Sequence, residues 1–104
     1  MNATDFMNVV RIELSRHGFA TFRTNVGKVR LADGRFFDTG LPKGFSDLIA
    51  IKDGKIYFIE TKVKPYKATK EQEEFIEMMK TRYGCRAGVA YTIEEVFEIC
   101  QLKN

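Results

Sequence analysis

The sequence has no apolar stretch that approaches the length of a transmembrane helix, and its first residues lack the pattern of a signal peptide. It contains only two cysteines and one histidine, with no internal repeats or low-complexity segments. Cys85 and Cys100 lack the spacing of zinc ligands, so we expect buried free thiols. We therefore expect a soluble cytoplasmic protein without a zinc site or a membrane partner.

Length and composition predict a single domain over residues 1–104, because 104 residues with 44% hydrophobic content suffice for one core and not for two. Positive charge is concentrated in one part of the chain. Residues 1–70 contain thirteen Lys and Arg against seven Asp and Glu, whereas residues 71–104 contain four against seven. The basic part is suited to a phosphate backbone.

Two runs of β-branched and aromatic residues, 45–52 and 55–63, flank the dipeptide Asp53-Gly54. This dipeptide predicts a type I′ turn and hence a β-hairpin. In that register Asp47 faces Glu60, and alternation along each strand places both acids on one face with Lys62. The register therefore predicts an apolar face that ends in two acids and a lysine.

Two carboxylates on opposite strands repel each other unless a positive charge lies between them. Oxygen ligands of this kind favour Mg²⁺ or Mn²⁺ over zinc, and the backbone carbonyl of Thr61 offers a further oxygen. Lys62 would orient or deprotonate an attacking water and offset charge on a phosphate. The pattern thus predicts metal-assisted hydrolysis of a phosphodiester. The alternative interpretation is that Glu60-Thr61-Lys62 is a solvated strand edge without chemistry.

The remaining segments predict an α/β fold with a mixed sheet flanked by helices. His17 is expected to cap the first helix rather than to act in catalysis. Thr69 and Gln72 fit a capping box, so capping is the structural alternative to any role of Gln72 in the site. The expected elements are a helix from Thr4 to about His17, a strand over 19–24, a strand-and-turn region over 29–37, the hairpin, a helix over 69–83, a strand over 86–91 and a helix from Thr92.

The motif residues resemble those of the PD-(D/E)XK nuclease superfamily, and within it the VRR-NUC branch of small stand-alone viral and bacterial proteins. The resemblance rests on residues 44–49, residues 57–62 and Gln72, with further likeness at residues 23–27 and 33–35. It extends over about residues 8 to 93. Many superfamily members also carry a glutamate early in the first helix, where this chain has Asp5, with Glu13 further along.

The resemblance implies an αβββαβ core and a role for each motif residue. Asp47 and Glu60 would be metal ligands with the Thr61 carbonyl, Lys62 the catalytic lysine and Gln72 an accessory residue of the active site. It also implies a homodimer that makes paired cuts in a bacterial cell or a phage-infected host. Whether Asp5 or Glu13 contributes is left open.

Basic residues around the motif are candidate contacts for nucleic acid, although each lysine also has the alternative of solvating a loop. The candidates are Arg23, Lys28, Arg30, Arg35, Lys43, Lys64 and Lys67. The leading hypothesis is a Mg²⁺- or Mn²⁺-dependent endonuclease on structured DNA, such as a four-way junction, in replication or repair. A non-catalytic nucleic-acid-binding module is the first alternative, and a protein-interaction domain with an incidental Glu-x-Lys is the second.

Overall fold

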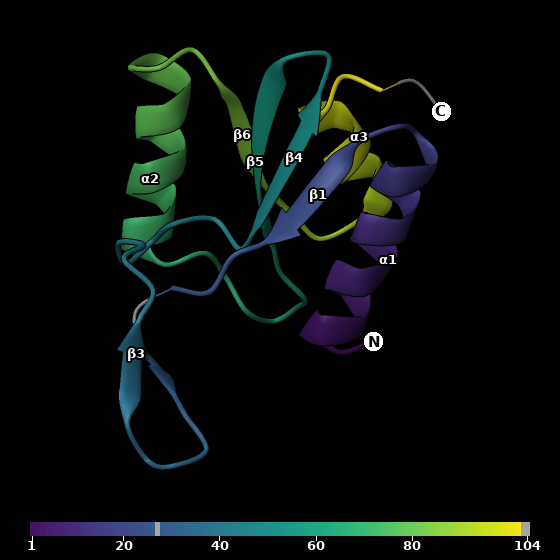
Figure 1. Cartoon of the computed structure of the whole chain (residues 1–104). Helices are drawn as coiled ribbons and strands as arrows, with labels where there is room; N and C mark the ends of the chain where they lie inside the picture. The colour runs from purple at the N-terminus through teal and green to yellow at the C-terminus, as the bar shows by residue number, and fades with distance from the viewer. Residues whose placement is uncertain (27, 103–104) are drawn as a thin grey trace.

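The computed structural model describes residues 1–26 and 28–102 and shows an α/β fold with a four-stranded mixed sheet (Figure 1). The strands β1, β4 and β5 are antiparallel neighbours, and β6 pairs in parallel with β5. In chain order the elements are α1 (Ala3–Arg16), β1 (Ala20–Arg23), β2 (Lys28–Arg30), β3 (Phe36–Asp38), β4 (Leu48–Lys52), β5 (Lys55–Thr61), α2 (Lys70–Thr81), β6 (Arg86–Ala90) and α3 (Ile93–Ile99).

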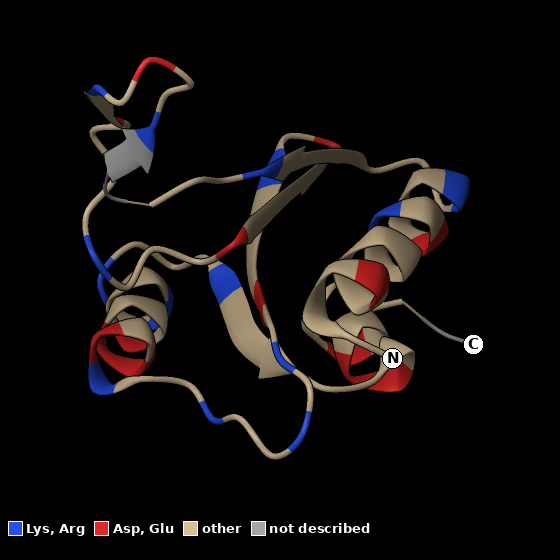
Figure 2. Cartoon of the chain, turned by 90° about the horizontal axis from the view of Figure 1, so that it is seen from below, with Lys and Arg blue, Asp and Glu red and all other residues tan. Residues whose placement is uncertain are grey.

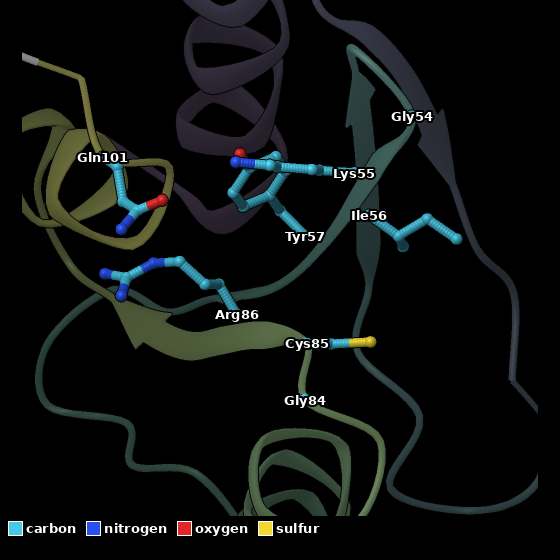
Figure 3. A pocket seen from close by; sticks show the side chains of 8 residues that line it. All are labelled: Gly54, Lys55, Ile56, Tyr57, Gly84, Cys85, Arg86 and Gln101. Carbon is cyan, nitrogen blue, oxygen red and sulfur yellow. The ribbon is translucent and has the colours of Figure 1, made fainter.

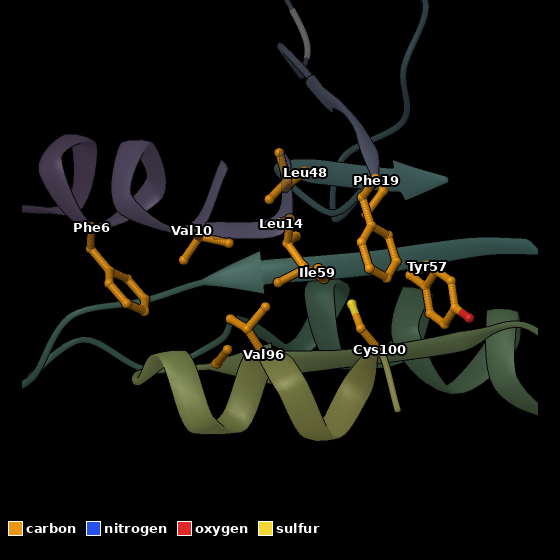
Figure 4. Packing of buried hydrophobic residues seen from close by; sticks show 11 residues of the cluster. Phe6, Val10, Leu14, Phe19, Leu48, Tyr57, Ile59, Val96 and Cys100 are labelled. Carbon is orange, nitrogen blue, oxygen red and sulfur yellow. The ribbon is translucent and has the colours of Figure 1, made fainter. Parts of the chain in front are cut away.

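Helices lie on both faces of this sheet because each strand of the central pair is apolar on both faces. Leu48 and Ile59 point toward α1 and α3 and pack with Leu14 and Val96 in the main core (Figure 4). On the opposite face the rings of Phe45, Phe58 and Phe75 pack together under α2. This arrangement confirms the fold class predicted from the sequence.

The Asp53-Gly54 turn has the predicted geometry, with positive φ at both residues, 52° at Asp53 and 76° at Gly54. The register across it also agrees with the prediction, since Lys52 pairs with Lys55 and Ile49 with Phe58. The first predicted strand is shorter than expected, however, because β4 begins at Leu48. Asp47 still accepts from the Thr24 N–H at 3.0 Å, in line with the β1–β4 register, but its own N–H donates to the Glu60 side chain at 3.2 Å instead of into the ladder.

Several predicted element ends differ from the structure for local reasons. Helix α1 begins at Ala3, and its N-cap is Asn2 rather than Thr4, because the Asn2 side chain accepts from the Asp5 N–H at 2.8 Å. Helix α2 ends at Thr81, two residues before the predicted Tyr83. His17 is the C-cap of α1, as expected, with its Nδ1 2.9 Å from the Glu13 carbonyl oxygen.

The predicted strand-and-turn region over 29–37 forms a separate two-stranded ribbon, β2–β3, rather than part of the main sheet. It projects from the end of the molecule where β4 begins and β5 ends (Figure 1). Among the described residues, no helix is long and apolar enough to cross a membrane. Cys85 and Cys100 are free thiols, of which Cys100 is buried and Cys85 is partly exposed.

Candidate active site

Asp47 and Glu60 meet at one end of the sheet, where β4 begins and β5 ends. The backbone N–H of Asp47 donates to Oε1 of Glu60 at 3.2 Å, so the two acids are joined directly. Glu60 is almost completely buried, with 4% of its surface exposed. The predicted pairing of the two acids is therefore present, although it runs from backbone to side chain instead of through the strand ladder.

The carboxylate of Asp47 is held by Thr61, the residue after Glu60. The Thr61 N–H donates to Oδ1 at 3.0 Å, and the Thr61 hydroxyl donates to Oδ2 at 2.7 Å. In a strand the N–H and carbonyl of one residue point to the same side, so the Thr61 carbonyl also points toward Asp47. The sequence reasoning assigned Thr61 only a backbone role and missed its hydroxyl, for which the signal is its position directly after Glu60.

Two further side chains reach Oε2 of Glu60. Nε2 of Gln72 donates to it at 3.2 Å, and Nζ of Lys62 lies 3.6 Å from it. The Gln72 side chain also completes the capping box of α2, because its Oε1 accepts from the Thr69 N–H at 2.9 Å. The capping box is thus confirmed, and the other end of the same amide contacts Glu60, while the accessory role of Gln72 in an active site stays a prediction.

Burial raises the pKa of both acids, and at Glu60 the neighbouring negative charge adds to the rise. The pKa of Glu60 is raised to about 7, first by burial and then by the negative charge of Asp47, while Lys62 and the Asp47 N–H counteract part of the rise. Burial also raises the pKa of Asp47, against the donors of Thr61 and the charges of Lys62 and Arg23. Two adjacent acids with raised pKa values form a site that a cation would stabilise.

The donor chemistry of this pair suits a divalent ion that prefers oxygen. Each carboxylate oxygen has two lone pairs, and the hydrogen bonds from Thr61 use one on each oxygen of Asp47. Two protein carboxylates are the usual number for Mg²⁺, which keeps waters as further ligands. Within residues 1–26 and 28–102, no cluster of three or more His, Cys, Asp or Glu is present, so neither Asp5 nor Glu13 joins the pair.

Gly44 sets the position of the loop that leads into Asp47. Its φ is +93°, and a Cβ atom there would lie 2.4 Å from the carbonyl oxygen of Glu71 in the first turn of α2. The loop therefore packs against the backbone at the start of α2. This close approach brings the two segments that carry Asp47 and Gln72 together.

The predicted nucleic-acid contacts lie on several segments around the acid pair. The charge of Arg23 acts on Asp47, Lys43 lies 3.7 Å from Glu71, and Arg35 is paired with Asp33 at 2.7 Å. Arg30, Lys64 and Lys67 are exposed, and the side chain of Lys28 lies outside the described part of the structure. Figure 2 views the molecule from this end, with Lys and Arg on both the projecting ribbon and the connection from β5 to α2.

A hollow of about 560 Å³ lies at the opposite end of the sheet, beside the Asp53-Gly54 turn (Figure 3). Its lining includes Lys55, Tyr57, Cys85 and Arg86. None of the residues predicted for the site lines it. The guanidinium of Arg86 donates to the carbonyls of Ile99 at 2.6 Å and Glu98 at 2.7 Å, which stabilises the end of α3.

Comparison with solved structures shows which known proteins share this fold. The chain is similar to a structure described as a VRR_NUC domain, with a TM-score of 0.67 and 18% identity, over 95% of this chain and 94% of that one. It is also similar to Hjc from Archaeoglobus fulgidus, a Holliday junction resolvase, with a TM-score of 0.55 and 21% identity, over 85% of this chain and 65% of that one.

The sequence comparisons gave no match to any protein-family model or to any curated protein. The structural similarity confirms, at the level of the fold, the resemblance to VRR-NUC and PD-(D/E)XK nucleases that the motif residues carry.

Proposed function

We propose that this protein is a Mg²⁺- or Mn²⁺-dependent endonuclease that hydrolyses phosphodiester bonds in structured DNA, with the four-way junction as its first candidate substrate. One observation carries the proposal. The Asp47 N–H, Nζ of Lys62 and Nε2 of Gln72, which belong to three segments of the chain, converge on the two carboxylate oxygens of Glu60 at one sheet end. The shared fold with a VRR_NUC domain and with a Holliday junction resolvase supports the reaction class.

In the proposed reaction, Asp47 and Glu60 would hold the metal ion, and the carbonyl of Thr61 would supply a further oxygen. The bound ion would polarise the phosphate and lower the pKa of a water. Thr61 orients Asp47 by its two hydrogen bonds, and Gln72 orients Glu60 from the start of α2.

Lys62 places a positive charge at the rim of this acid pair. Its side chain is 18% exposed, so the ammonium group is accessible to a substrate phosphate while it lies 3.6 Å from Glu60. There it orients the attacking water and offsets the charge that develops on the phosphate oxygens. Water attacks the phosphorus and the P–O bond to one sugar breaks. The leaving sugar oxygen takes up a proton, so one strand end carries a phosphate and the other a hydroxyl.

Homodimerisation is part of the proposal, because resolving a four-way junction takes two cuts. The β2–β3 ribbon offers a contact, since Phe36 and Phe37 are 64% and 58% exposed. An isolated two-stranded ribbon gains stability by packing against something else. Light scattering of the wild type and of Phe36→Ser/Phe37→Ser tests this, with a dimeric wild type and a monomeric variant expected. A monomeric wild type would contradict it.

The substrate is tested with a panel of labelled DNAs of equal length, namely single strand, duplex, flap and four-way junction, in Mg²⁺ or Mn²⁺. We expect the junction to be cut fastest and all cutting to stop in EDTA. If another DNA structure is cut faster, that structure and not the junction is the substrate.

The alternative function is a non-catalytic nucleic-acid-binding module, which predicts salt-sensitive binding without cutting. Calorimetric titration with Mn²⁺ separates both functions from a protein-interaction domain. We expect the wild type to bind Mn²⁺ and Glu60→Gln to bind it much more weakly, because one of two carboxylates is lost. Absence of Mn²⁺ binding and of DNA binding in the wild type would leave the protein-interaction domain.

A further inference from the structure

Tyr66 is the one aromatic residue on the connection from β5 to α2. Its surface is 68% exposed, and the neighbouring Lys64 and Lys67 are exposed as well. This connection follows directly after Lys62 and lies at the site end of the molecule (Figures 1 and 2). An aromatic ring between two lysines matches the chemistry of a nucleotide, since a phosphate is an anion and a base presents a flat π-face.

Hydrogen bonds on both sides hold the backbone of Tyr66. Its N–H donates to the Val63 carbonyl at 3.0 Å, and its own carbonyl accepts from the Tyr91 hydroxyl at 2.7 Å. At the end of the connection, the Thr69 N–H is bound by Gln72, the same side chain that contacts Glu60. The ring is therefore presented to solvent from a held backbone, which lowers the entropy lost on stacking.

The position of Tyr66 in the chain limits its distance from the site. Tyr66 is the fourth residue after Lys62, and four extended residues span at most about 14 Å. Successive nucleotides in a DNA strand are about 3.4 Å apart along the helix axis. Tyr66 thus lies within about four nucleotides of a phosphate bound at Lys62.

We propose that the Tyr66 ring stacks on an unpaired nucleobase within a few nucleotides of the phosphate bound at Lys62. In a duplex the faces of each base are covered by its neighbours, so the ring takes a base only where stacking is interrupted. The inference rests on the proposed function and deepens it. It makes an unpaired or splayed base near the cut part of the substrate, with Lys64 and Lys67 on the adjacent phosphates.

The chain has no tryptophan, which allows a direct test of stacking. Tyr66→Trp introduces a single indole whose fluorescence is quenched when a base stacks on it. Tyr83→Trp is the matched control, because Tyr83 is 60% exposed and follows the far end of α2. Both variants are titrated at low salt in EDTA with oligothymidylate and with a blunt duplex, and fluorescence anisotropy of labelled DNA reports binding independently.

We expect oligothymidylate to quench Tyr66→Trp more strongly than the duplex does, and to leave Tyr83→Trp unchanged. Binding seen by anisotropy without quenching of Tyr66→Trp, or equal quenching by the duplex, would overturn the stacking proposal and leave the proposed nuclease intact. Absence of binding to every probe, with absence of cutting, would overturn both.

Two further variants measure the contribution of the ring. Tyr66→Ala should weaken binding to oligothymidylate by about 5- to 150-fold, the loss of one base–aromatic stack, whereas Tyr66→Phe should stay within about twofold of the wild type. Circular dichroism melts of both variants establish that they are folded. Equal affinity of folded Tyr66→Ala and wild type would count against stacking.

Discussion

Gln72 connects the start of α2 to the acid pair, so its replacement perturbs two contacts that separate variants distinguish. Its Oε1 accepts from the Thr69 N–H at 2.9 Å, and its Nε2 donates to Glu60 at 3.2 Å. Gln72→Ala removes both contacts. Thr69→Ala removes only the hydroxyl that accepts from the Gln72 N–H at 3.2 Å and leaves the Gln72 side chain in place.

The expected costs differ in their dependence on pH. Loss of the Thr69 cap costs about 1 kcal/mol at any pH. A hydrogen bond to an ionised group contributes about 1.5–3 kcal/mol, against about 0.5–1.5 kcal/mol for a neutral one. Since the pKa of Glu60 is about 7, the acid is neutral at pH 5.5 and ionised at pH 8.5. Gln72→Ala should therefore cost about 1 kcal/mol more at the higher pH.

Urea unfolding in EDTA at both pH values measures these differences, and thermal melts report about 4–8 °C for each kcal/mol in a domain of this size. The variant lacking Gln72 should lose stability more steeply with pH than the wild type, because removing the donor raises the pKa of Glu60 further. If Gln72→Ala and Thr69→Ala cost the same at both pH values, the contact between Gln72 and Glu60 contributes nothing and the reasoning is wrong.

Three other predictions concern Glu60, Gly44 and the thiols. Between pH 4.5, the ordinary pKa of a glutamate, and about pH 7, Glu60 is protonated in the folded protein and ionised in the unfolded chain. The free energy of unfolding in EDTA should therefore fall as pH rises through this window. Glu60→Gln should flatten that fall, and an equally steep fall in the variant would contradict the assignment. Gly44→Ala should lower the free energy of unfolding in urea by more than about 2 kcal/mol, because its Cβ would meet the Glu71 carbonyl at 2.4 Å. Gly40→Ala is the control, since Gly40 also has positive φ but a Cβ there would have nothing within 4 Å, and it should cost about 1 kcal/mol. Equal costs would argue against the close approach at Gly44. Burial raises the pKa of Cys100 to about 12, so iodoacetamide should modify the partly exposed Cys85 first. Mass spectrometry of the native protein measures both rates, and equal rates would refute this.

The sequence predicts the central hairpin because the residues that determine it are close together in the chain. Asp53-Gly54 supplies positive φ at both turn positions, and this turn then determines every cross-strand pair from Lys52–Lys55 to Leu48–Ile59. The meeting of Asp47 and Glu60 follows from the same register. The capping box at Thr69 is likewise local, since its residues lie three apart.

Long-range contacts account for what the sequence did not predict. The strand containing Asp47 stops early because the Asp47 N–H donates to the side chain of Glu60, thirteen residues away, instead of to a strand carbonyl. Asp33-Gly34 indicates a local turn between β2 and β3, but no local pattern indicates that the resulting ribbon stays apart from the main sheet. The contact between Gln72 and Glu60 also depends on how α2 packs against the rest of the fold. The close approach of Gly44 to Glu71 is part of that packing.

The central claim is that the acid pair and Lys62 form a nuclease site, and cutting and binding measured together on one junction test it most directly. Wild type, Lys62→Ala and the control Lys55→Ala, an exposed lysine at the opposite sheet end, are compared on a labelled four-way junction in Mg²⁺ or Mn²⁺. We expect wild type and Lys55→Ala to cut the junction, and Lys62→Ala to bind it and leave it intact. Binding without cutting by all three proteins, or cutting that survives Lys62→Ala, would contradict it.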